Sequence, residues 1–424
     1  MKDVYLDYKV SQKVDDIYNQ LLALDQVQAG MEFIKENEAE TIQDLIDLTL
    51  IEAPTFHERK RAEYFAECLK KLGLEDVMID EHCVVSGVRK GAGTGPRVVV
   101  DAHTDTVFPI GTVKEVRREG DVLYAPGIGD DTSGLATILG VIRGLNASGI
   151  QTKGDLVFTG TPREEGMGML GGMRDYLADH HEEVDAVLAL DCDELGAIIY
   201  DAAGMRTAEV NFYGIGGHAV CFGEMASPSN AAAIAVAKIC RLEVPKEPWT
   251  ILCVSNIHAG NDAGIHAIPP KATIKYNIRS TSPEVLEDLD QRIKRCIQEA
   301  CDEETAYWGK DTITWDHKLL CSAPAGTQPL DVGPIQAVYR VAQGFGAKPF
   351  FRTCGCTNAS HAIAHGIPAV CMARSNYPQG MEFDTKAHNL DECVHVKDYY
   401  KVPQEVFLTA LMCAGVEGAT ESVL

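Results

Sequence analysis

Three short apolar runs, each followed closely by acidic or histidine side chains, constrain the fold of this chain more than any other feature. The runs cover residues 98–100, 156–158 and 187–190. Short, uninterrupted apolar runs are typical of strands that are buried on both faces of a sheet. A helical pattern over residues 134–145 lies between the first two runs. Strands that alternate with helices predict an α/β fold with a mostly parallel sheet flanked by helices.

Polar side chains follow the predicted strands at the points where the strands end. They are His103 and Asp105 after the first run, Glu164 and Glu165 after the second, and Asp191 after the third. In an open α/β sheet, ligands bind at the carboxyl ends of the strands. We therefore expect these side chains to meet at one edge of the sheet and to form a candidate functional site.

Each of these motifs also has a simpler structural interpretation. A His-x-Asp motif occurs by chance, Asp130 lies in a glycine-rich turn that could begin a helix, and adjacent glutamates are common on solvated surfaces. Together with His388, however, they make a set of two histidines and several carboxylates. This set suits Zn²⁺, with Co²⁺ or Mn²⁺ as alternatives, whereas Ca²⁺ rarely takes imidazole. One carboxylate of the Asp130-Asp131 pair could bridge two ions about 3.5–4 Å apart, so a pair of ions is the metal hypothesis.

The pattern changes near residue 206, where strand-like segments and helices of a second kind begin. The strand-like segments cover residues 207–213, 250–254 and 273–278. Two helices begin at Ser-Pro pairs, Ser227-Pro228 and Ser282-Pro283, where serine caps the helix and proline fits its first turn. We predict an inserted α+β domain over residues 206–316, and a catalytic domain made of residues 1–205 and 317–424.

An amphipathic helix is predicted within residues 54–72. Thr55 and Glu58 have the spacing of a capping box, in which a hydroxyl and a carboxylate satisfy the free N–H groups at the start of a helix. Apolar residues at helical spacing follow, and Gly73 stands where a helix commonly ends. This helix is expected to serve packing alone.

The net charge of −24 narrows the possible partners. It argues against nucleic acid, whose phosphates would be repelled, and against an anionic membrane surface. The first residues lack the apolar segment and small-residue cleavage site of a secretory signal. No apolar run approaches the roughly 18 residues that a membrane span needs. We therefore expect a soluble, cytoplasmic protein whose 14 cysteines are reduced thiols.

In this order and at these positions, the motifs resemble those of the M20 family of metallopeptidases, which includes carboxypeptidase G2-type, aminoacylase and peptidase T-like enzymes. The resemblance runs from Ile51-Glu-Ala-Pro54 to Glu392. It implies a zinc-exopeptidase type fold with an inserted lid or dimerisation domain. The resemblance implies that Asp130 bridges two ions. One ion would also be held by His103 and Asp191, and the other by Glu165 and His388. Glu164 would be the general base, and Asp105 would orient His103.

The resemblance extends to the inserted domain. His218 matches a histidine that usually reaches into the active site of a neighbouring subunit, and Arg279 matches an arginine that binds the substrate carboxylate. Three positions depart from the family pattern or vary within it. Thr132 stands where lysine is common, His266 where asparagine is common, and Asp191 where some branches carry glutamate. The resemblance implies a homodimer formed through the inserted domain, with substrate bound near His218, Arg279 and His266.

Four functional hypotheses follow. The first is a metal-dependent peptidase that cleaves di- or tripeptides. The second and third are an N-acyl-amino-acid deacylase and a carboxypeptidase-type amidohydrolase, which differ in the end of the substrate that carries a free charge. The fourth is a non-catalytic binding protein of the same fold, which the presence of every expected ligand and of Glu164 disfavours.

Overall fold

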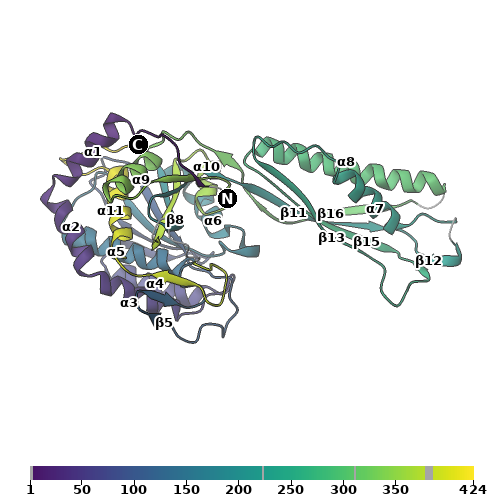
Figure 1. Ribbon diagram of the computed structural model, residues 1–424, viewed down its shortest axis with the longest axis horizontal. Coiled ribbons are helices and arrows are strands. Elements are labelled where there is room, and N and C mark those ends of the chain that lie inside the picture. Colours follow the sequence, from purple (N-terminus) through teal and green to yellow (C-terminus); the bar gives the residue numbers. More distant parts are fainter. Residues whose placement is uncertain (1–2, 222–223, 310–311, 378–384) are drawn as a thin grey trace. The chain divides into compact units, whose positions relative to one another are not determined.

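The computed structural model describes residues 3–221, 224–309, 312–377 and 385–424 of the 424-residue chain. The chain divides into two compact units, whose elements are labelled in Figure 1. Unit 1 consists of Met1–Ala202 and Thr327–Leu424, and unit 2 consists of Ala203–Gly326. Unit 2 ends ten residues later than the predicted 316, because strand β16 (Thr314–Ala323) pairs along its length with β11 (Gly204–Tyr213).

A nine-stranded sheet forms the centre of unit 1, in the order β1-β18-β9-β19-β8-β4-β7-β3-β2. Its strands are β1 (Asp3–Val4), β2 (Glu75–Ile79), β3 (Val85–Arg89), β4 (Val98–His103), β7 (Leu156–Thr161), β8 (Ala186–Glu194), β9 (Ala197–Ile199), β18 (Phe350–Arg352) and β19 (Ala369–Tyr377). The four neighbours β19, β8, β4 and β7 run parallel, whereas β1, β2 and β3 join in antiparallel directions. The predicted mostly parallel sheet is confirmed, and its three apolar runs are the central strands β4, β7 and β8.

Helices cover both faces of this sheet. Successive residues of a central strand point to opposite faces, and in these strands both sets of residues are apolar. Val98 and Val100 of β4 belong to one buried apolar cluster, and Val99 between them belongs to another. The first cluster includes residues of α1 (Gln12–Leu22), α2 (Asp25–Glu36), α3 (Glu38–Thr49), α4 (Arg59–Lys71), α5 (Thr132–Ser148), α9 (Gly333–Gly344) and α11 (Lys401–Ala414). The second includes residues of α6 (Gly171–His180) and α10 (Ala359–Ala364). Within the described residues, no helix combines the length and the apolar character that crossing a membrane requires.

A small three-stranded sheet, β20-β6-β5, completes the part of unit 1 that concerns the site. It consists of β5 (Arg117–Glu119), β6 (Val122–Tyr124) and β20 (Cys393–His395). Backbone pairing of Cys393 with Tyr124 links the segment after His388 to the segment that leads to Asp130. This pairing brings two loops together that are more than 250 residues apart in the sequence.

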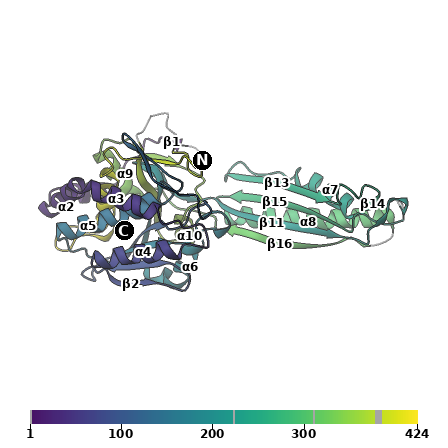
Figure 2. The same ribbon diagram turned by 90° about the horizontal axis from the view of Figure 1, so that it is seen from below.

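Unit 2 is an antiparallel sheet with two helices on one face, and Figure 2 shows its strands in the order β13-β15-β11-β16. The further elements are β13 (Thr250–Ala259), β15 (Lys271–Ser280), α7 (Pro228–Ile239) and α8 (Pro283–Trp308). Alternate strand residues such as Phe212 and Ile274 pack with Ile293 and Ile297 of α8 in one buried cluster. The two helices begin at the Ser-Pro pairs as predicted, so the α+β character of the inserted segment is confirmed.

Candidate metal centre

Three adjacent strands carry candidate ligands to one edge of the unit 1 sheet. His103 is the last residue of β4, which lies between β7 and β8. Glu164 and Glu165 follow the end of β7, and Asp191 lies in the second half of β8. The parallel register sets His103 beside Thr161, the last residue of β7. The strands therefore end side by side, and their terminal side chains meet.

Two further side chains reach the same place from loops. Asp130 lies two residues before helix α5, whose N-cap is Asp131, and His388 lies in the turn before β20. Together these residues form three groups in which potential ligand atoms lie within 4.8 Å of one another. The groups are His103 with Asp130 and Asp191, Asp130 with Glu165 and His388, and His103 with Glu164 and Glu165.

Asp130 and Glu165 each share a group with both histidines, and Asp130 faces the two imidazoles with different oxygens. Its Oδ1 lies 2.9 Å from Nε2 of His103, and its Oδ2 lies 3.4 Å from Nε2 of His388. The same His388 nitrogen lies 2.7 Å from Oε1 of Glu165. Each oxygen of Asp130 thus faces a different imidazole, which is the arrangement that a carboxylate shared between two cations requires.

The charges in this cluster are unbalanced in a way that a cation would relieve. Burial raises the pKa of Asp191 to about 7, although the nearby Arg374 acts in the opposite direction. Burial also raises the pKa of Glu164 well above its usual range, and the neighbouring Asp191 and Glu165 add to this rise. Hydrogen bonds to Asp130 and Glu165 raise the pKa of His388 to about 10. Crowded carboxylates with two imidazoles fit a divalent ion of the zinc type by their chemistry.

Asp105 holds the residues that follow β7 in place next to the cluster. It is fully buried, and its carboxylate accepts hydrogen bonds from the backbone N–H groups of Glu164 and Glu165 at 2.9 and 3.0 Å. Nδ1 of His103 lies 3.0 Å from the backbone carbonyl of Asp105 and 3.5 Å from its carboxylate. The ring is therefore held through its second nitrogen, which leaves Nε2 facing Asp130.

The predicted capping box at residues 55–58 is wrong, and its two polar residues support the candidate site instead. Helix α4 begins only at Arg59, and no side chain caps it. The hydroxyl of Thr55 donates to the Asp105 carboxylate at 2.9 Å. Glu58 accepts from the backbone N–H of Arg163 at 3.0 Å. A buried carboxylate nearby offers the hydroxyl a stronger partner than an exposed backbone N–H group does.

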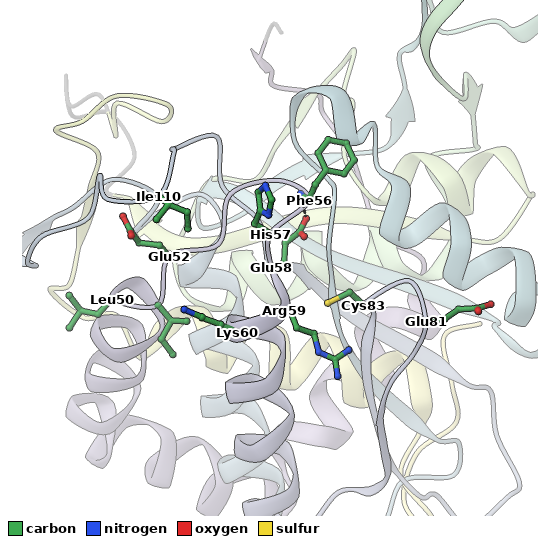
Figure 3. A pocket seen from close by; sticks show the side chains of 11 residues that line it. Leu50, Glu52, Phe56, His57, Glu58, Arg59, Lys60, Glu81, Cys83 and Ile110 are labelled. Atoms are coloured by element: carbon green, nitrogen blue, oxygen red, sulfur yellow. Dashed lines mark hydrogen bonds between the residues drawn. The ribbon is translucent and has the colours of Figure 1, made fainter.

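This same segment borders a pocket of about 880 Å³, which Figure 3 shows from close by. Phe56 and Ile110 supply exposed apolar surface, and His57, Arg59 and Lys60 supply basic groups to its lining. Glu58 also lines the pocket and contacts the backbone of Arg163, one residue before Glu164. The pocket therefore shares a supporting residue with the strand-end cluster.

Glu392 links the loops that carry Asp130 and His388, and it was not predicted as a functional residue. Its carboxylate accepts from the backbone N–H groups of Gly129 and Asp130, both at 2.8 Å, and from that of His388 at 3.3 Å. The side chain is buried. The short Asp-Glu pair after His388 was the only signal in the sequence, and charged pairs of this kind are common on surfaces.

Arg374 is a second residue that the sequence did not single out. It lies on β19 and is only 4% exposed. Its Nη1 donates to Oδ1 of Asp130 at 2.8 Å and also to Oδ1 of Asp191, and its Nε donates to Asp193 at 3.0 Å. One guanidinium therefore contacts three carboxylates around the candidate ligands. An arginine within an apolar run gave no indication of these contacts.

The three candidate residues in unit 2 fall into two places. His218 pairs with Ala267, and the backbone carbonyl of His266 accepts from Ala219, so the two histidines are close neighbours on exposed segments. Arg279 lies near the other end of β15, where its Nε donates to Asn277 at 3.3 Å. Strand β15 begins at Lys271, shortly after His266, and eight residue steps of extended strand lead from there to Arg279, a distance of roughly 26 Å. Within unit 2, the structure groups the histidines but not the arginine.

Comparisons with known proteins agree with this fold. The model of Peptidase family M20/M25/M40 matches residues 99–411. Carboxypeptidase G2 from a Pseudomonas species is 28% identical over 299 residues, which cover 68% of each chain. A succinyl-diaminopimelate desuccinylase from Leptothrix cholodnii is 24% identical over 351 residues, which cover 76% of this chain and 85% of the relative.

Solved structures show the same fold. The aminopeptidase PepT from Bacillus cereus superposes with a TM-score of 0.72 at 19% identity, covering 88% of this chain and 98% of that one. A dinuclear metal-binding M20 peptidase from Bacillus subtilis has a TM-score of 0.65 at 17% identity, covering 90% of this chain and 99% of that one.

The protein is a hydrolase of the metallopeptidase and amidohydrolase class. This follows from the long family match, and the sheet with its histidine and carboxylates at the strand ends agrees with it. The chain belongs to peptidase family M20/M25/M40.

Proposed function

We propose that this protein is a dinuclear metal-dependent hydrolase that cleaves the peptide bond of di- or tripeptides. The observation that carries the proposal is the shared position of Asp130, with one oxygen facing His103 and the other facing His388. One ion would be held by His103, Asp130 and Asp191, and the other by Asp130, Glu165 and His388. Zn²⁺ suits these donors best, with Co²⁺ and Mn²⁺ as alternatives.

Glu164 is the proposed general base. Bound divalent ions would supply a water of lowered pKa and would polarise the amide carbonyl. Glu164 would take a proton from the attacking water as the water oxygen bonds to the carbonyl carbon, and it would return that proton to the leaving nitrogen as the C–N bond breaks. Asp105 keeps Glu164 in place through the backbone N–H of that residue.

The choice of a short peptide rests on the relatives. The solved structures with similar folds include the aminopeptidase PepT and a tripeptidase from Staphylococcus aureus. Among relatives of higher sequence identity, a succinyl-diaminopimelate desuccinylase favours an N-acyl amino acid as the second candidate substrate. Carboxypeptidase G2 favours a carboxypeptidase-type amidohydrolase as the third candidate. The absence of catalysis is the remote alternative, and the complete donor set with its adjacent glutamate speaks against it.

A substrate panel tests the proposed function. Purified protein is loaded with Zn²⁺, Co²⁺ or Mn²⁺ in separate samples and given free and N-blocked di- and tripeptides, C-terminally amidated peptides, and N-acetyl and N-succinyl amino acids. We expect hydrolysis of free di- or tripeptides with a kcat/KM at least about tenfold above that of any N-acyl amino acid. Faster cleavage of N-acyl amino acids would replace this proposal by a deacylase. If no compound of the panel is hydrolysed with any of the three metals, both the peptidase and the deacylase proposals are contradicted.

We further propose a homodimer formed through unit 2, in which His218 of one subunit acts in the site of the other and Arg279 binds a substrate carboxylate. His218 is exposed, and its Nδ1 accepts from the backbone of Val220, which leaves Nε2 available to a substrate. His266, beside it, is the proposed modifier of substrate choice. The expected cytoplasmic location stays a prediction from the sequence.

Complementation tests this arrangement. Proteins carrying His218→Ala and Glu164→Ala are each expected to be inactive, and a purified mixed dimer of the two is expected to recover up to about half of the wild-type activity per subunit. The recovery arises because one of the two sites in the mixed dimer combines both intact residues. A mixed dimer verified by two different affinity tags that shows no recovery would contradict the action of His218 across subunits.

A further inference from the structure

Arg374 holds a position inside the candidate metal centre that the proposed function does not use. The residue lies on β19 and is almost wholly buried. Nη1 donates to Asp130 and to Asp191, which together with His103 form one of the groups of candidate ligands. The Asp130 oxygen that it contacts, Oδ1, is the same atom that lies 2.9 Å from Nε2 of His103. The guanidinium thus occupies donor atoms that an ion in this group would need.

This position is fixed by the residues behind the guanidinium. Nε donates to Oδ1 of Asp193 at 3.0 Å. Asp193 is fixed in turn, because its Oδ2 accepts from the hydroxyl of Thr385 at 2.8 Å and its carbonyl accepts from Ser375 at 2.9 Å. Asp193 therefore fixes the guanidinium through Nε, and Nη1 of the same planar group points at the candidate ligands Asp130 and Asp191.

The second group of ligands has a different environment. His388 lies 2.7 Å from Glu165 and 3.4 Å from Oδ2 of Asp130. No hydrogen bond or ion pair between Arg374 and Glu165 or His388 occurs in the described part of the chain. The two groups that share Asp130 are thus unequal, since a resident positive charge contacts one of them and not the other.

We propose that Arg374 is a resident cation that competes with a divalent ion for the His103, Asp130 and Asp191 group, so that the two metal sites fill in order. The Glu165 and His388 site binds first and tightly. The other site binds more weakly, because a divalent ion there must displace Nη1 from Asp130 and Asp191 and must then remain close to a like charge in a buried environment. This inference rests on the ligand assignment of the proposed function.

The same contacts let Arg374 balance the charge of the carboxylates when metal is absent. Asp130, Asp191 and Asp193 would repel one another without a counter-charge, and buried carboxylates are costly when unpaired. Arg374 pairs with all three. We therefore expect it to stabilise the metal-free protein while it weakens one of the two metal sites.

Metal titration of the apoprotein tests the inference without relying on turnover. Chelated, dialysed protein is titrated with Co²⁺ and followed by calorimetry and by visible absorption, which reports the coordination of each ion. The wild type is expected to bind in two steps whose dissociation constants differ by at least about tenfold. In Arg374→Met, which keeps the length and removes the charge, the weaker site is expected to tighten by at least about tenfold, so that the steps merge.

A matched control and a stability measurement accompany the titration. Arg340→Met removes another partly buried arginine that pairs with an aspartate, Asp15, at 2.6 Å, and it should leave both steps unchanged. Thermal unfolding of the metal-free proteins should show a lower Tm for Arg374→Met than for the wild type. Saturating Co²⁺ should then raise the Tm of Arg374→Met by more than it raises that of the wild type.

The outcomes separate this inference from the proposed function. If the wild type binds no Co²⁺, the proposed function itself fails. If it binds two ions of equal affinity, or if Arg374→Met binds the second ion as weakly as the wild type or more weakly, the resident-cation inference is overturned and the proposed function stands. Should Arg374→Met not fold, Arg374→Lys decides, because its shorter side chain lacks the fork: a narrower separation of the two steps supports the inference, and an unchanged one overturns it.

Discussion

Replacing Glu164 with glutamine is expected to lower kcat by about 10²- to 10⁴-fold while the protein keeps its metal ions. The amide has the size of the carboxyl group but cannot take a proton from water or return one to the leaving nitrogen. Glu164 is held by a backbone hydrogen bond to Asp105, which the substitution does not touch. The expected loss is therefore one of chemistry and not of position.

The measurement pairs steady-state kinetics on the best peptide of the panel with metal analysis of the same sample. Glu63→Gln serves as the control, because Glu63 is an exposed glutamate of α4 that pairs with Arg59. KM is expected to change little, since the base acts in the transition state. A variant that keeps more than about a tenth of the wild-type kcat would remove Glu164 from the role of base. A variant that loses its metal would instead make Glu164 a ligand, which its place beside His103 and Glu165 permits.

Replacing Asp130 with alanine is expected to have the other large effect, which is the loss of both ions and of activity. Asp130 belongs to the group of His103 and to the group of His388. Removal of one residue therefore takes a ligand from each ion and also the counter-charge of Arg374 at 2.8 Å. We expect each site to weaken by more than about 100-fold, which exceeds the usual effect of losing a residue that only supports a ligand.

Metal analysis after gel filtration and titration with added Zn²⁺ measure this effect. Asp44→Ala is a suitable control, because Asp44 also pairs with an arginine, Arg143 at 2.6 Å, away from the cluster on helix α3. Circular dichroism establishes that both variants fold. If Asp130→Ala keeps one ion at wild-type affinity, Asp130 serves a single site and the two ions are not bridged.

The local pattern was sufficient to predict the main architecture and the candidate ligands. Continuous apolar runs identify strands buried on both faces, and parallel strands bring their carboxyl ends to one edge. His103, Glu165 and Asp191 could therefore be expected to meet before their distances were known. The start of helix α4 was predicted wrongly, because the capping pattern of Thr55 and Glu58 cannot reveal that a buried carboxylate and the backbone of Arg163 lie within reach.

Residue type and short-range spacing are enough to predict the class of fold, the family and the set of residues that could bind metal. The residues that hold this set together become evident only in the folded chain. Glu392 contacts Asp130 across 262 positions, and Arg374 contacts the same aspartate across 244. Contacts of this kind follow from how strands and loops pack in space, and neither a glutamate after a turn nor an arginine in an apolar strand shows its partner. The inequality that we propose between the two metal sites arises from one such contact.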